Sequence, residues 1–151
     1  MDAKSENYAN SNSITTIPNL KITGQTKILY RRYREVSKIT NKMLQTLADA
    51  IFADLRLNAL TITFAGRRPH TSNGRRITRE VLGVHTQGSF YQSIRIYKLT
   101  AAKQQLVSAK SAISTLIHEI NHNIDINILK LDSIHSKGFY MRLKQLTIAI
   151  S

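Results

Sequence analysis

The chain of 151 residues contains no cysteine. Any metal ion in this protein must therefore be held by His, Asp or Glu, because thiolate ligands are excluded. The lack of cysteine also agrees with an intracellular address. No apolar run approaches the roughly 20 residues needed to span a bilayer, and the N-terminus has no signal-peptide core. We expect a cytoplasmic protein without a membrane partner, at the nucleoid in a bacterium or in the nucleus of a eukaryote.

Acidic side chains are also scarce, with nine Asp and Glu against 22 Lys and Arg and a formal net charge of +13. Because each neutralised phosphate releases counterions, this surplus favours polyanionic partners such as nucleic acid. The alternative is that basic charge only keeps the protein in solution. With 42% hydrophobic and 21% charged residues, the composition is that of a globular protein, and the length suits one domain.

The first 20 residues are rich in Ser, Asn and Thr and poor in large apolar side chains. Such a segment cannot bury enough surface to offset the entropy of ordering, so we expect a flexible tail at 1–20 before a domain at 21–151. At the start of that domain, apolar residues at helical spacing predict one long helix over 26–55.

The remaining elements predict an α+β fold with a small three-stranded antiparallel sheet. Alternating and β-branched residues predict strands at 59–65, 80–86 and 93–99. Isoleucines at helical spacing predict a helix through about Leu129, and a last helix follows His135.

The first of these two helices carries the motif H-E-x-x-H, formed by His118, Glu119 and His122. Residues four apart lie one turn apart, so both imidazoles leave the same helix face and can share one tetrahedral ion. Glu119 is then placed to take a proton from metal-bound water. The alternative is that both histidines are ordinary surface residues. The segment is apolar enough to be substantially buried, however, and buried imidazoles need partners.

His135 is the leading candidate for a third ligand. It lies far enough beyond His122 for the helix to end and the chain to return. Asp125 is a rival because it shares the helix face of the two histidines, and Asp132 is a weaker one. Asp125 is alternatively an acceptor that fixes the tautomer of an imidazole, or a surface carboxylate.

Residues 114–143, which carry these candidate ligands, resemble the SprT-like zinc metallopeptidases, the family of the Spartan DNA–protein crosslink proteases. Members carry H-E-x-x-H, twelve residues, and a histidine that opens a motif such as H-G-K-E-W; here the same interval ends at His135-Ser136-Lys137-Gly138-Phe139. Leu82-Gly83 and Ile94-Arg95-Ile96 are similar to the strand pair before the active-site helix. The resemblance covers about residues 27–150, but only residues 114–143 carry a pattern specific to the family.

The resemblance implies Zn²⁺ ligation by His118, His122 and His135, with Glu119 as general base. Two features depart from the family pattern. Ser136 replaces the usual glycine, so the local turn is expected to differ, and the Cys-rich zinc ribbon of many bacterial members is missing. The family's outer strand commonly lies beside the zinc cleft. Residues 93–99 are the candidate for that edge, where an extended substrate would pair through its main chain; the alternative is a core strand without a ligand role.

Between the first two predicted strands lies a long basic loop with turn signals and no acidic residue. Guanidinium groups bind phosphate bidentately, so the loop is a candidate DNA contact that reads no sequence. The alternative is a solvated hairpin tip. The loop arginines are Arg67, Arg68, Arg75, Arg76 and Arg79.

Three functions follow from these observations. The first is a zinc-dependent endopeptidase that acts on nucleic-acid-associated proteins. The second is a DNA-binding module in which zinc is mainly structural. The third is a peptidase or toxin with a narrow protein target and no role at nucleic acid.

Overall fold

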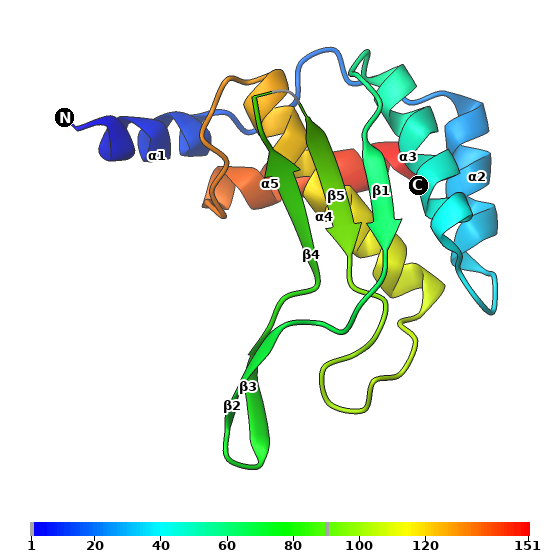
Figure 1. Ribbon diagram of the computed structural model, residues 1–151. Coiled ribbons are helices and arrows are strands. Elements are labelled where there is room, and N and C mark those ends of the chain that lie inside the picture. Colours follow the sequence, from blue (N-terminus) through cyan, green and yellow to red (C-terminus); the bar gives the residue numbers. More distant parts are fainter. Residues whose placement is uncertain (1, 90) are drawn as a thin grey trace.

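The computed structural model describes residues 2–89 and 91–151, and within them the chain folds into five helices and five strands (Figure 1). The α+β prediction is confirmed. Among the described helices, none has the length and apolar character of a membrane span. The elements are α1 (Ala3–Ser13), α2 (Gly24–Arg34), α3 (Asn41–Asp54), β1 (Thr61–Phe64), β2 (His70–Asn73), β3 (Arg76–Glu80), β4 (Gly83–Gln87), β5 (Gln92–Ile96), α4 (Ala109–Asn127) and α5 (Lys137–Ile150).

The main sheet has the order β1-β5-β4, and its strands are not all antiparallel as the sequence predicted. β4 and β5 form an antiparallel pair, whereas β1 and β5 are parallel, with Ile62 opposite Ile94. The prediction was wrong because alternation reveals a strand but not its direction. The chain leaves β1 through a projecting hairpin, turns back at the outer edge as β4, and returns through the middle as β5.

Helix α4 packs against β4 and β5 and lies behind the sheet in the view of Figure 1. Ile113, Ile117, Ile120 and Ile124 are all buried, which confirms the predicted core-facing stripe. Since this stripe points into the core, the histidines of α4 lie on a different part of the helix surface, near the open edge of the sheet.

The helix predicted over 26–55 is two helices, α2 and α3, separated at residues 35–40. Glu35 is the C-cap of α2, and Thr40 is the N-cap of α3, where its hydroxyl accepts a hydrogen bond from the Met43 amide at 3.2 Å. The break brings α2 and α3 into contact, so that Tyr30 and Leu44 are buried in one core. Apolar spacing continued across the break, which hid the capping signal.

The predicted flexible tail contains helix α1, which packs against α5. Asp2 caps the helix by accepting a hydrogen bond from the Ser5 amide at 2.8 Å. Composition predicted a tail because α1 has few large apolar residues. Its contacts with the domain are instead largely polar, and Ser11 is fully buried among them.

The predicted basic loop contains a two-stranded hairpin, β2 and β3, which projects from the body of the molecule (Figure 1). Gly74 occupies its turn with a φ of 62°, in the left-handed region that glycine adopts without strain. Asn73 pairs with Arg76 on either side of this turn.

Candidate metal centre

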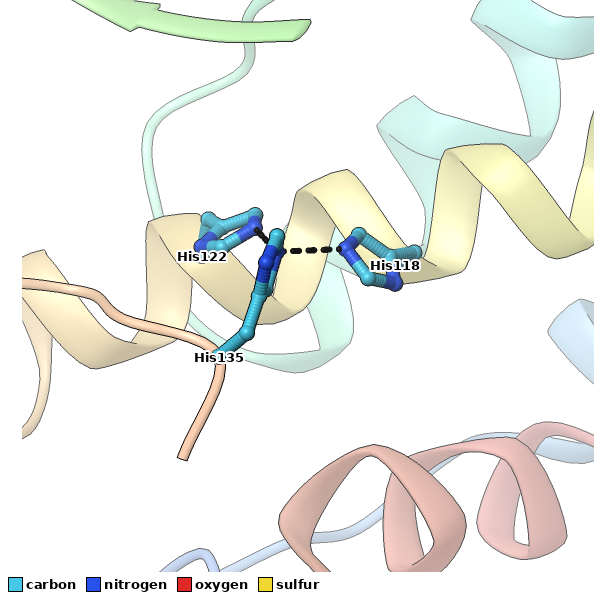
Figure 2. A group of neighbouring side chains, drawn as sticks. All are labelled: His118, His122 and His135. Atoms are coloured by element: carbon cyan, nitrogen blue, oxygen red, sulfur yellow. Dashed lines mark hydrogen bonds between the residues drawn. The ribbon is translucent and has the colours of Figure 1, made fainter. Parts of the chain in front are cut away.

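Three histidine side chains converge on one point between α4 and the loop that leads into α5. His118 and His122 leave one face of α4, while His135 approaches from the loop and lies between them (Figure 2). The Nε2 atom of His135 lies 3.1 Å from Nε2 of His118 and 3.0 Å from Nε2 of His122. The sequence-predicted ligands are thus brought together.

The spacing of these nitrogens fits a shared metal ion. Bonds of about 2.0–2.1 Å to a tetrahedral ion place its ligand atoms about 3.3 Å apart, close to the separations seen here. Each Nε2 carries either one hydrogen or one lone pair, so His135 cannot make a good hydrogen bond to both neighbours. Among the described residues, 2–89 and 91–151, these three histidines are the one group of His, Asp and Glu side chains whose ligand atoms lie close enough together to share a metal ion. The cluster could hold a metal ion.

The tautomer of His122 follows from its contact with Ser133. The hydroxyl of Ser133 donates its single hydrogen to Oδ2 of Asp125 at 2.9 Å. Nδ1 of His122 lies 2.6 Å from the same hydroxyl oxygen, so the imidazole must be the donor in that contact. The lone pair of His122 is therefore on Nε2, the atom that faces the other two histidines.

Neither carboxylate proposed as an alternative ligand reaches the cluster. Asp125 is fully buried, and both of its oxygens accept hydrogen bonds from Arg142, at 3.0 and 3.1 Å. Asp125 instead acts on the site through Ser133, in line with the alternative role of a tautomer-fixing acceptor. Asp132 is exposed and lies outside the three-histidine group.

Glu119 is buried next to the cluster, with 6% of its surface exposed. Burial raises the pKa of its carboxyl to about 7, and a hydrogen bond from the main chain of His85 offsets this only in part. Burial also lowers the pKa of His122 to about 3, and that of His118 is lowered for the same reason. At neutral pH these two imidazoles are therefore uncharged, which is the form that binds metal.

Two cavities of about 310 and 350 Å³ lie on either side of this centre and share Gly83, Glu119 and His135 in their walls. The first extends towards His85 and Ser133, and the second towards Arg79, Val81 and Leu82, a set that belongs to the base of the hairpin. Because they share these walls, the two cavities adjoin at the metal centre, one beside His122 and the other beside His118, and together they are called the groove.

Strand β4 borders this groove as the outer strand of the sheet. Residues 93–99 were the expected edge, but they contribute β5, which has neighbours on both sides. The assignment was wrong because neither strand's sequence reveals its position in the sheet. Gly83 permits close packing of β4 on α4, since a Cβ atom there would lie 2.6 Å from Cγ2 of Thr115 and 3.4 Å from Cγ of Glu119.

The five predicted arginines separate into two groups. Arg67 donates to the carbonyl of Ala101, and Arg68 pairs with Glu80 at 3.5 Å, so both are engaged within the protein. The other three are exposed on or beside the projecting hairpin, and one of them also lines the groove beside the metal centre. These three are Arg75, Arg76 and Arg79.

Sequence reasoning missed two residues of the site, Ser133 and His85. His85 lines the groove, and its Nε2 lies 3.1 Å from Nδ2 of Asn123; burial lowers its pKa. It lies outside the three-histidine group. No spacing rule could have found either residue, because each reaches the site through a strand or loop placed by tertiary packing.

Fold and site together define an α+β protein with a three-histidine candidate metal centre in an open groove. Comparison of the chain with protein-family models, curated proteins and solved structures found no match.

Proposed function

We propose that this protein is a zinc-dependent endopeptidase of the SprT-like type. One observation carries the proposal: three imidazole nitrogens converge, and a buried carboxylate, Glu119, lies in the wall of the groove beside them. Zinc is the metal we propose because all three candidate ligands are imidazoles and a tetrahedral site leaves one position open for water. The minimal SprT-like fold is part of the same proposal.

When bound, zinc lowers the pKa of a coordinated water and polarises the carbonyl of the peptide bond. The protein's own groups supply the rest of the chemistry. Glu119, whose pKa is raised by burial in the metal-free protein, accepts a proton from the attacking water and later delivers it to the leaving amine. His118, His122 and His135 hold the metal, and Ser133 keeps His122 in the tautomer that presents its lone pair.

The groove favours a substrate that is bound in the middle of an extended polypeptide over one that is bound by its terminus. β4 is an edge strand, so its free main-chain groups are available to pair with an extended substrate, and the cavities on both sides leave room for the chain to continue. Cleavage within a chain, rather than removal of terminal residues, is the expected outcome.

Nucleic acid is the proposed second partner, bound without sequence preference. Arg75 and Arg76 are exposed at the hairpin turn, and Arg79 lies where the hairpin meets the groove. A phosphate backbone held along this hairpin would bring proteins attached to the nucleic acid next to the metal centre. Proteins crosslinked to DNA are therefore the proposed substrate class.

The deciding experiment is the Glu119→Gln variant, assayed for zinc content and for cleavage of an unfolded casein-like protein. We expect zinc to be retained and cleavage to be lost, whereas His122→Ala loses the metal. Glu35→Gln, which changes a carboxylate outside the groove, is the matched control and keeps full activity. Cleavage by Glu119→Gln at the wild-type rate would show that the proposed mechanism is wrong.

A further inference from the structure

We infer that the N-terminal helix α1 is a positioning element of the metal centre. It holds the loop at residues 132–136 and the start of α5 so that His135 meets the other two histidines. This inference rests on the proposed metal site but not on peptide hydrolysis. It starts from a contrast between the ligands. His118 and His122 are fixed by the regular backbone of α4, whereas His135 lies in a segment without regular secondary structure.

Two asparagines of the N-terminal region bind main-chain groups on both sides of His135, one in the loop and one in the first turn of α5. The Asn7 side chain donates to the carbonyl of Asp132 at 2.9 Å and accepts from its amide at 3.0 Å. The carbonyl oxygen of the Asn12 side chain accepts from the amide of Gly138 at 3.0 Å. Because both asparagines contact backbone groups, they fix the path of the chain through His135 rather than any one side chain.

Ser11 adds a third contact at the residue after His135. Its hydroxyl lies 2.6 Å from the hydroxyl of Ser136, which also caps α5 by accepting from the Phe139 amide. This cap gives Ser136 a role at the position where the resemblance predicted glycine. The approach of α1 is close enough to require glycine two residues later, since a Cβ on Gly138 would lie 1.9 Å from the Ser11 carbonyl oxygen.

The same helix end reaches His122 through a buried polar chain. Arg142 donates to the carbonyls of Ser11 and Ile14 at 2.6 and 2.5 Å while it holds Asp125. Asp125 in turn accepts from Ser133, which fixes the tautomer of His122. The segment at residues 7–14 therefore supports two of the three candidate ligands through intermediate residues.

The contacts of α1 are largely polar, so the helix does more than complete the hydrophobic core. α1 presents few apolar side chains, and Tyr8 is 56% exposed, so apolar burial contributes little to its docking. Its specific contacts are instead concentrated on the loop around His135 and on Arg142.

The test compares Asn7→Ala/Asn12→Ala with the matched control Asn10→Ala, using full-length protein. Asn10 is exposed on the same helix, and its side chain makes no hydrogen bond within the described residues. Zinc affinity is measured by competition with a chelator, and the absorption spectrum of the cobalt(II) form reports the ligand geometry. We expect the double variant to bind zinc about tenfold more weakly, with an altered cobalt spectrum, while the control matches wild type.

Two single variants separate positioning from general loss of structure. Asn12→Ala is expected to weaken zinc binding, and Asn12→Asp to restore it, because aspartate keeps an acceptor for the Gly138 amide. Zinc affinity of the double variant within about twofold of wild type overturns the inference, as does a wild-type chain that binds no zinc. Weaker zinc binding in a protein that cleaves nothing supports the inference while the peptidase proposal fails.

Discussion

Arg142 and Asp125 form an ion pair whose side chains are fully buried, with Nε of the arginine 3.0 Å from Oδ1 of the aspartate. The guanidinium also donates to the carbonyls of Ser11 and Ile14, so its hydrogen-bonding groups are used in several directions at once. A buried charge is tolerated only when its partners are this complete. The pair joins α1, α4 and α5 and is linked through Ser133 to His122 of the candidate metal centre.

Lysine should not replace Arg142. Arg142→Lys keeps the charge but loses the planar fork, which leaves acceptors on Asp125 or α1 without a donor. We expect the free energy of unfolding to fall by about 2–3 kcal/mol, measured by chemical denaturation. Arg32→Lys, at an exposed position of α2, serves as the control and should change stability by less than about 0.5 kcal/mol. Equal effects of the two substitutions would contradict the assigned role of the pair.

Ser133 should influence metal binding without being a ligand. Ser133→Ala removes the acceptor for Nδ1–H of His122, so the imidazole is free to adopt the tautomer with hydrogen on Nε2. We expect about tenfold weaker zinc binding, and restoration by Ser133→Thr, which keeps the hydroxyl. Nitrogen-15 NMR of the histidine rings reports the tautomer directly in metal-free protein. A His122 that keeps hydrogen on Nδ1 in Ser133→Ala would argue against this account.

Glu119 should reduce the stability of the metal-free protein. Its pKa is raised from 4.5 to about 7, so the folded state binds the proton more tightly than the unfolded chain. The contribution of Glu119 to the free energy of unfolding therefore falls as the pH rises from about 4.5 to about 7. We expect Glu119→Gln to be more stable than wild type by up to about 3 kcal/mol at about pH 8.

This stability difference should shrink towards zero below about pH 4.5, where the carboxyl is protonated in both states. Denaturation of both proteins in a chelator at several pH values provides the measurement. A constant difference between variant and wild type across this range would mean that the ionisation of Glu119 is not its cause.

The hairpin arginines should determine the salt dependence of DNA binding. The triple variant Arg75→Ala, Arg76→Ala, Arg79→Ala is expected to bind DNA more weakly, with a salt slope lower by about 0.9 for each phosphate that it no longer neutralises. The control removes the same charge from exposed positions elsewhere, through Arg32→Ala, Lys38→Ala and Lys42→Ala. If both triple variants bind DNA equally weakly, the effect comes from net charge and the hairpin is not the binding surface.

The spacing of residues along the sequence was sufficient to predict the part of the candidate centre that lies on α4. His118, Glu119 and His122 are four or fewer residues apart on a helix, and the helical period alone fixes which faces they occupy. The isoleucine stripe of α4 and the start of α5 after His135 were predictable for the same reason. Helix periodicity is a local property, so tertiary contacts were not needed to recognise it.

The direction of each strand, its neighbours in the sheet and the paths of the loops could not be predicted from the local sequence. The sequence allowed Asp125 as a ligand, and its burial against Arg142 in the folded protein excludes that role. Likewise, the place of β4 at the open edge depends on the route of the whole chain through the sheet.

The sequence by itself thus determined a helix with two imidazoles and a carboxylate on its surface, together with an excess of positive charge. The tertiary structure decided that His135 joins the two histidines of α4 and that Ser133 sets the tautomer of His122. It also decided that helix α1, whose sequence shows no motif, supports His135 and Ser133. The physical reason is range: a helical repeat is set by residues within one turn, whereas α1 meets the loop at His135 across more than a hundred residues of intervening chain.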